Sequence, residues 1–220
     1  MIARLCVSVS LVVGLTASTP LATDEDDDSS DRSPLRPDLI GVWVGVSFDS
    51  RPGELGGLAA GHDFHAVGLR LGWDLVKRQS LLFQYTADII PFAMVTDNPR
   101  YRTATASFNG VRPRWLTGHE TKYGVGITPI GFRVGAFVSR VFVFGSAGIG
   151  ILVFEGEVPT PGASSLNATF GLGGGMDIRI VGGWSLGMAY ALHHISNAGR
   201  SYENPGIDSH VLYIGSQWRH

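Results

Sequence analysis

The sequence is poor in cysteine, in charged residues and in long apolar runs. Its only cysteine, Cys6, lies in an N-terminal apolar stretch, so the remainder has no disulfide and no thiol chemistry. Charged residues make up 16% of the 220 residues, below the roughly 25% that is typical of soluble domains. Beyond the N-terminus, no apolar run reaches the roughly 18 residues that a transmembrane helix needs. Basic and acidic residues nearly balance from Ser33 onward, without an extended basic patch, so we expect no nucleic-acid partner.

The N-terminus has the pattern of an export signal. A basic start at Arg4 precedes an apolar stretch from Leu5 to Leu15, and small residues follow up to Ala22. This order predicts a secretory signal over residues 1–22, with the cleavage position left open. An acidic run over residues 24–28 comes next, and we expect residues 23–38 to form a disordered, solvated leader.

From Leu39 to the end of the chain, apolar and polar residues alternate with the period of β-strands. The alternation predicts one domain over residues 39–220 that contains eight strands. They span Leu39–Phe48, Phe64–Val76, Ser80–Ile90, Tyr123–Val134, Val141–Phe154, Leu166–Ile180, Trp184–Ser196 and Ile207–Trp218.

The second predicted strand shows which face is apolar. Val67, Leu69, Leu71, Trp73 and Leu75 form one face, and Gly68, Arg70, Gly72 and Asp74 form the other. An apolar outer face with a small or polar inner face is the pattern of a transmembrane barrel wall. A soluble, lipocalin-like barrel would place the apolar face inside. In the narrow interior of a membrane barrel, the polar groups would fill the lumen and hydrogen-bond to one another.

The lengths of the connections favour the membrane barrel. Three links are short, around residues 77–79, 135–140 and 181–183, and they alternate strictly with four longer ones. Outer-membrane barrels have short periplasmic turns and long external loops, with an even number of strands. The sequence therefore predicts an all-β fold, an eight-stranded antiparallel transmembrane β-barrel of the bacterial outer membrane.

A serine, a histidine and a carboxylate come together near the end of the chain. His194 and Ser196 are two residues apart, so on a strand they point to the same side. Asp208 follows after one loop, at the start of the last predicted strand. If His194 or Ser196 lies opposite Asp208 in this hairpin, all three side chains share the outward face, whereas a slip of one residue would send Asp208 inward.

This trio has the composition of an esterase site. Ser196 would be the nucleophile, His194 would accept and return its proton, and Asp208 would orient the imidazole. Asn197 could donate a hydrogen bond to an oxyanion through its side chain or its backbone amide. Polar side chains on a lipid-facing wall are costly unless they lie near the interface or are used, and this cost favours a function.

The residues around the trio carry a family resemblance. The segment His194-x-Ser196-Asn197-Ala198-Gly199, followed by Asn204-Pro205-Gly206 and an acid, resembles the lipid A 3-O-deacylases, a family of outer-membrane barrels. Other stretches fit the same family between Leu39 and the end of the chain. They are Tyr123-Gly124-Val125-Gly126 with Pro129 and Gly131, Gly148-Ile149-Gly150 through Phe154, and Pro159-x-Pro161 before Asn167.

The resemblance implies hydrolysis of the ester-linked acyl chain at position 3 of lipid A, without a cofactor. It assigns the serine to Ser196, the histidine to His194 and the oxyanion asparagine to Asn197. The acid of the family is often glutamate, whereas the matching residue here is Asp208, one methylene shorter. Glu203, in the preceding loop, is the substitute candidate. The expected partners are lipid A in the outer leaflet and the membrane itself, and a homodimer is left open.

Two other interpretations use the same residues. A metal site made of His193, His194 and His210 is disfavoured, because neighbouring residues on a strand point to opposite sides. A non-catalytic barrel with a structural or partner-binding role in the envelope is the alternative to the enzyme. Porin function is not expected, because eight strands leave no open channel.

Overall fold

The computed structural model describes residues 36–50, 53–97, 100–103, 114–118 and 120–220. The predicted signal and most of the predicted leader lie outside these residues. Within the described part, no helix is long and apolar enough to cross a membrane. The strands are β1 (Leu39–Ser50), β2 (His62–Arg78), β3 (Leu81–Asp97), β4 (Arg100–Thr103), β5 (Arg114–Gly118), β6 (Thr121–Val138), β7 (Val141–Val158), β8 (Ser164–Val181), β9 (Trp184–Ser196) and β10 (Ile207–Arg219).

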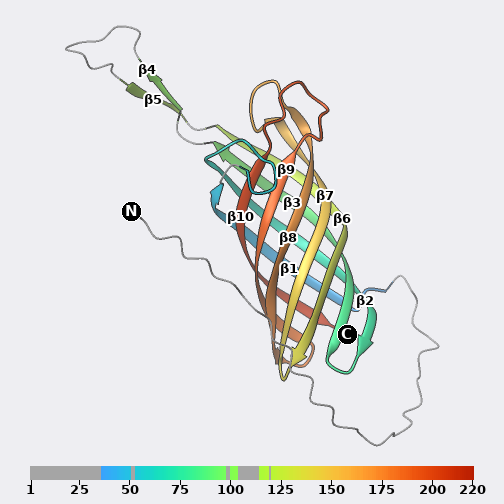
Figure 1. Ribbon diagram of the computed structural model, residues 1–220. Helices are drawn as coiled ribbons and strands as arrows, with labels where there is room; N and C mark the ends of the chain where they lie inside the picture. The colour runs from blue at the N-terminus through green and yellow to red at the C-terminus, as the bar shows by residue number, and fades with distance from the viewer. Residues whose placement is uncertain (1–35, 51–52, 98–99, 104–113, 119) are drawn as a thin grey trace, which may run out of the picture. The chain divides into compact units, whose positions relative to one another are not determined.

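Eight of these strands close into an antiparallel barrel in the order β1-β10-β9-β8-β7-β6-β3-β2 (Figure 1). The first and last barrel strands pair with each other, so the sheet has no free edge. The predicted eight-stranded antiparallel barrel is therefore confirmed. The eight strands match those that the alternation indicated, and most of them extend further at their ends.

The longest predicted link is only partly a loop. The sequence predicts a connection over residues 91–122, between a strand that ends at Ile90 and one that begins at Tyr123. In the structure β3 continues through Pro91 to Asp97, and the pairing with β6 shifts register between Ile90 and Ala93. The shift accommodates the proline without ending the strand. Beyond it, β4 and β5 pair as a separate two-stranded sheet.

The two ends of the barrel differ as the sequence indicated. At one end, β2–β3, β6–β7 and β8–β9 are each joined by two residues. Gln79, Ser139 and Gly182 take positive φ values of 48°, 57° and 54° in these turns, as tight hairpin turns require. The four longer connections lie at the other end, which we call the long-loop end (Figure 1).

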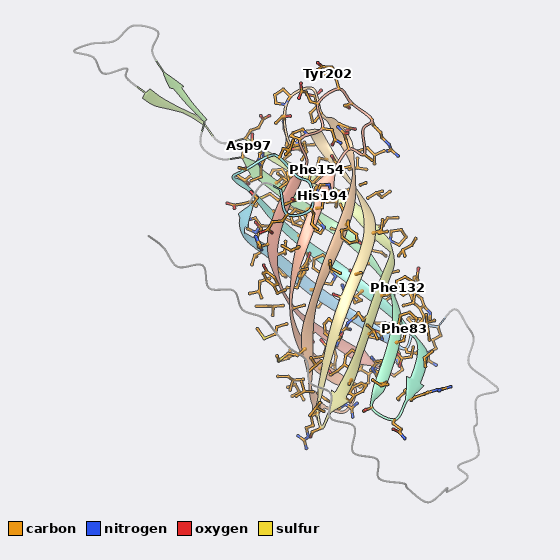
Figure 2. The ribbon with its side chains drawn as sticks, in the orientation of Figure 1. Phe83, Asp97, Phe132, Phe154, His194 and Tyr202 are labelled. Atoms are coloured by element: carbon orange, nitrogen blue, oxygen red, sulfur yellow. The ribbon has the colours of Figure 1, made fainter. Side chains whose placement is uncertain are left out.

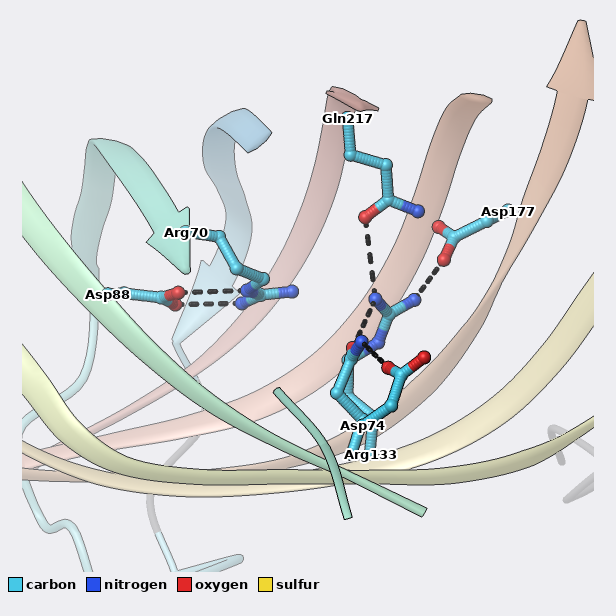
Figure 3. A network of polar contacts seen from close by, with 7 residues as sticks. Arg70, Asp74, Asp88, Arg133, Asp177 and Gln217 are labelled. Carbon is cyan, nitrogen blue, oxygen red and sulfur yellow. Dashed lines mark hydrogen bonds and ion pairs between the residues drawn. The ribbon is translucent and has the colours of Figure 1, made fainter. Parts of the chain in front are cut away.

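Inward polar side chains contact one another in the lumen (Figure 3). Towards the short turns they lie beside a small apolar cluster of Leu82, Phe142 and Phe144. Arg70 binds Asp88 through two hydrogen bonds of 2.8 and 2.7 Å. Arg133, which is 2% exposed, forms an ion pair with Asp177. Gln84 donates to Asp74 over 2.8 Å. These contacts confirm the prediction that inward polar groups bond to each other, while residues such as Val44, Leu69 and Leu186 cover the outer wall.

A larger apolar cluster lies in the half of the lumen behind the long-loop end. Its buried members are Ala59, Phe64, Ala66, Ile90, Ala93, Val95, Leu152, Phe154, Val158, Ile195, Ile207 and Val211. Ile195 and Ile207 face each other across the β9–β10 ladder, and both are 0% exposed. The outward residues next to them in the sequence, His194, Ser196 and Asp208, therefore lie over a packed apolar interior rather than over an open pore.

Candidate active site

His194 and Asp208 meet on the outer wall of the barrel. They are register partners in the β9–β10 ladder, and His194 Nδ1 lies 2.6 Å from Asp208 Oδ1. The two strands therefore fix this pair through backbone pairing, in the register that the sequence left open. Figure 2 shows His194 towards the end of the barrel that carries Tyr202, away from Phe83 and Phe132.

Asp208 is buried although it points outward. The loop between β1 and β2 folds over it, and the backbone N–H groups of Leu55 and Gly57 donate to Asp208 Oδ2 over 2.7 and 2.9 Å. The aspartate is 1% exposed, whereas the His194 side chain is 19% exposed. Three hydrogen bonds to the charged carboxylate offset the cost of removing it from water.

The same loop is held by the chain that leads into β10. The N–H of Leu58 donates to the carbonyl of Pro205, and that of Ala59 donates to the carbonyl of Gly206 over 3.0 Å. Ala59 also forms a parallel bridge with Ile207. Two connections that lie some 150 residues apart in the sequence thus form one covered corner around Asp208.

Sequence reasoning missed the role of this loop. Its donors are backbone N–H groups, which every residue except proline carries, so no residue type marks them. The signal that could have found it is the lack of a side chain at Gly57. A Cβ there would lie 2.7 Å from Asp208 N and 2.8 Å from Asp208 Oδ1.

Ser196 shares the outward parity of His194 and is partly exposed at the end of β9. It pairs with Ala168 of β8. Among the described residues, no hydrogen bond joins the Ser196 hydroxyl to His194. Catalytic hydrogen bonds are often long without substrate and tighten when it binds. The role of Ser196 as the nucleophile therefore stays a prediction.

Asn197 is 1% exposed and organises the β9–β10 loop. Its side-chain amide donates to the carbonyl of Glu203 over 2.7 Å, and its side-chain oxygen accepts from the N–H of Gly199 over 3.0 Å. Its backbone N–H donates to Asn204 Oδ1 over 2.9 Å. The backbone amide, one of the two predicted oxyanion donors, is therefore engaged in this conformation, whereas the side-chain amide keeps its second N–H.

Glu203, the substitute acid, lies in the β9–β10 loop with an exposed side chain. Its Cγ is 3.0 Å from the position that a Cβ on Gly162 would take, in the β7–β8 loop. The structure thus joins Asp208, and not Glu203, to the Nδ1 of His194.

The histidines of the rejected metal site do not converge. His193 points into the lumen, where its ring stacks on Phe64 with centroids 4.7 Å apart, while His194 points outward. In the part of the chain that the structure describes, no group of three or more potential ligands could hold a metal ion.

Comparisons with known proteins bear on the family and on the fold. A profile of the lipid A 3-O-deacylase (PagL) family matches residues 91–217, more than half of the chain. The crystal structure of the outer membrane enzyme PagL is similar, with a TM-score of 0.51 and 19% identity over 80% of this chain and 97% of that one. The crystal structure of Neisserial surface protein A gives a TM-score of 0.46 and 11% identity over 83% and 96%.

No curated protein matches the chain significantly. At 19% identity the solved enzyme shows the barrel fold alone, and the match to the family profile shows the family. The profile covers the chain from Pro91 in β3 to Gln217 in β10, and with it His194, Ser196 and Asp208. The protein is thus an outer-membrane β-barrel that belongs to the lipid A 3-O-deacylase (PagL) family.

Proposed function

We propose that this protein is a serine esterase that hydrolyses the ester-linked acyl chain at position 3 of lipid A in the outer leaflet. The observation that carries the proposal is the His194–Asp208 pair on the outer wall, 2.6 Å between Nδ1 and Oδ1. A buried carboxylate beside a histidine on a lipid-facing surface is expensive to build. A triad gives this arrangement a use, because the carboxylate stabilises the imidazolium that forms during the reaction.

The reaction assigns one task to each side chain. His194 Nε2 takes the proton of the Ser196 hydroxyl while the serine oxygen bonds to the acyl carbon. When the tetrahedral intermediate collapses, the bond from the acyl carbon to the 3-oxygen of lipid A breaks, and His194 returns the proton to that oxygen. Water, activated by the same imidazole, then cleaves the acyl-serine and releases a fatty acid.

In this mechanism, Asp208 holds His194 in the tautomer that the proton transfers require. A carboxylate at Nδ1 accepts the Nδ1–H, which leaves Nε2 as the base. Asn197 is the proposed oxyanion donor through the second N–H of its side-chain amide. That residue also anchors the loop through Glu203 and Gly199, so the loop would hold the donor in a fixed place.

The position of the pair matches the position of a lipid substrate. His194 and Asp208 are on the outside of the barrel at the end with the long loops, which faces the exterior in outer-membrane barrels. An acyl ester at the head of a lipid in the outer leaflet lies at the same level. Since the three residues all come from β9 and β10 of one chain, the site needs no second copy.

Lipid A from cells that express the wild type or Ser196→Ala tests the proposal by mass spectrometry. We expect loss of one hydroxyacyl chain from position 3 with the wild type and intact lipid A with Ser196→Ala. Ser216→Ala is the matched control, because Ser216 has the same outward parity near the short-turn end of β10, and it should behave as the wild type. Heat-modifiable gel migration verifies that each variant forms the barrel.

The non-catalytic barrel is the other candidate, and the same experiment separates the two. Unchanged lipid A with a properly inserted wild-type barrel would refute the esterase. Loss of a chain that persists in Ser196→Ala would refute Ser196 as the nucleophile while leaving a deacylase.

A further inference from the structure

A second group of polar side chains, Glu54, Tyr190 and His210, lies on the outer wall beside the proposed triad. His210, two residues after Asp208 on β10, forms an ion pair of 2.9 Å between its Nε2 and Oε2 of Glu54. The hydroxyl of Tyr190 on β9 hydrogen-bonds to His210 Nδ1. The Tyr190 and His210 rings also stack, with centroids 5.9 Å apart and 27° between their planes. The proposed mechanism gives no task to any of these three side chains.

This polar group lies on the apolar outer wall, where polar side chains are costly. Tyr190 and His210 point to the same side as Leu186 and Met188, which are 56% and 49% exposed on the apolar wall. The His210 and Glu54 side chains are 21% and 35% exposed. Pairing lowers the cost of charged groups at the membrane surface but does not explain their presence, because apolar residues at these positions would cost nothing.

The position of Glu54 in the sequence, next to the residues that bind Asp208, suggests a role for this polar group. Glu54 directly precedes Leu55, whose N–H donates to Asp208 Oδ2, and Gly57 supplies the second donor. The β1–β2 loop therefore binds β10 at two outward positions. The Glu54 side chain binds His210, and the backbone N–H groups of Leu55 and Gly57 bind Asp208. If the contact of the Glu54 side chain is lost, the backbone hydrogen bonds of Leu58 and Ala59 to the chain before β10 remain, but they lie on the far side of Gly57 from Leu55.

We propose that His210 is a positioning residue for the proposed reaction, and this inference rests on the proposed function. With Tyr190 and Glu54, it clamps the β1–β2 loop so that the N–H groups of Leu55 and Gly57 hold the Asp208 carboxylate towards His194. The two ring nitrogens of His210 suit the clamp, because Nε2 faces the Glu54 carboxylate while Nδ1 faces the Tyr190 hydroxyl.

The test compares the rates of lipid A deacylation in detergent micelles for single and double variants. We expect His210→Ala and Glu54→Ala each to lower kcat roughly tenfold with little change in KM, well short of the ~10⁴-fold loss caused by a wrong imidazole tautomer. The double variant should be no slower than either single one, because both changes open the same clamp. Glu54→Gln should restore most of kcat, since its amide oxygen still accepts from His210.

Lys122→Ala is the matched control. It removes another ion pair at the long-loop end, that of Lys122 with Glu120, which does not reach Asp208. We expect its kcat to stay within twofold of the wild type. A His210→Ala variant with wild-type kcat, or a double variant that shows the product of the two single losses, would overturn the clamp.

A second measurement does not depend on activity. Hydrogen exchange at the amides of Leu55 and Gly57 should be faster in His210→Ala than in the wild type, because these amides lose their fixed acceptor. Unchanged exchange would overturn the inference even in an inactive protein. A wild type that leaves lipid A intact would instead refute the proposed function, so the two failures are distinguishable.

Discussion

Replacing Gly57 by alanine tests how strongly the β1–β2 loop supports the proposed triad. The new Cβ would lie 2.7 Å from Asp208 N and 2.8 Å from both Asp208 Cγ and Oδ1, closer than Cβ atoms come to their neighbours. Asp208 is part of the β9–β10 ladder and cannot retreat, so the loop must. The hydrogen bond of 2.9 Å from Gly57 N to Asp208 Oδ2 is then lost.

The size of the effect follows from that bond. A hydrogen bond to a charged group contributes about 1.5–3 kcal/mol, and each 1.36 kcal/mol of transition-state stabilisation is worth about tenfold in rate. If the whole contribution orients Asp208, kcat/KM should fall about 10- to 150-fold. The loss should remain below the roughly 10⁴-fold that follows a wrong imidazole tautomer, because the N–H of Leu55 and the Nδ1 of His194 still hold the carboxylate.

The assay is the initial rate of acyl release from lipid A in detergent micelles, with gel migration to verify the barrel. Leu58→Ala is the control, because Leu58 is in the same loop, is 71% exposed and makes its bond to Pro205 through the backbone. It should keep the wild-type rate. A Gly57→Ala enzyme within twofold of the wild type would show that the loop does not hold the acid, and the reasoning would fail.

Two further predictions concern the acid and the lumen. Asp208→Asn should lower kcat by about 10³- to 10⁴-fold, by analogy with acid replacement in other triads, whereas Glu203→Gln should keep the wild-type rate; the opposite ranking in the same assay would make Glu203 the acid. Arg133→Met leaves Asp177 buried without its partner, so the free energy of unfolding should fall by about 3–5 kcal/mol. Urea unfolding followed by gel migration measures this change, and the double variant with Asp177→Leu should recover most of it; a double variant as unstable as the single one would contradict this account.

The barrel could be predicted from the sequence because its main signals are local. Alternation with period two is set within each strand, so residues such as Val67 and Arg70 reveal their faces without knowledge of their neighbours. The short links at Gln79 and Ser139 show which strands are paired. The continuation of β3 through Pro91 was missed because it is not a local signal. A register shift that tolerates a proline is a property of two paired strands together.

The candidate site was predictable only in part. The shared face of His194 and Ser196 follows from their spacing, but the contact of His194 with Asp208 depends on the register of a hairpin whose loop spans ten residues. The burial of Asp208 depends on Leu55 and Gly57, which lie 153 and 151 residues away in the sequence. No periodicity or motif carries such a contact, because the donors are backbone groups.

The covering loop changes what the outward trio means energetically. A bare aspartate on the wall of a membrane barrel would be in conflict with its lipid surroundings even if the trio has a function. The β1–β2 loop resolves this conflict, because it gives Asp208 two N–H donors and leaves it 1% exposed. His194 remains partly exposed, and the inward neighbours Ile195 and Ile207 belong to the packed apolar cluster. The acid is thus shielded from lipid by a loop and supported from inside by the filled lumen, so that the histidine and the serine are the members of the trio that face the membrane.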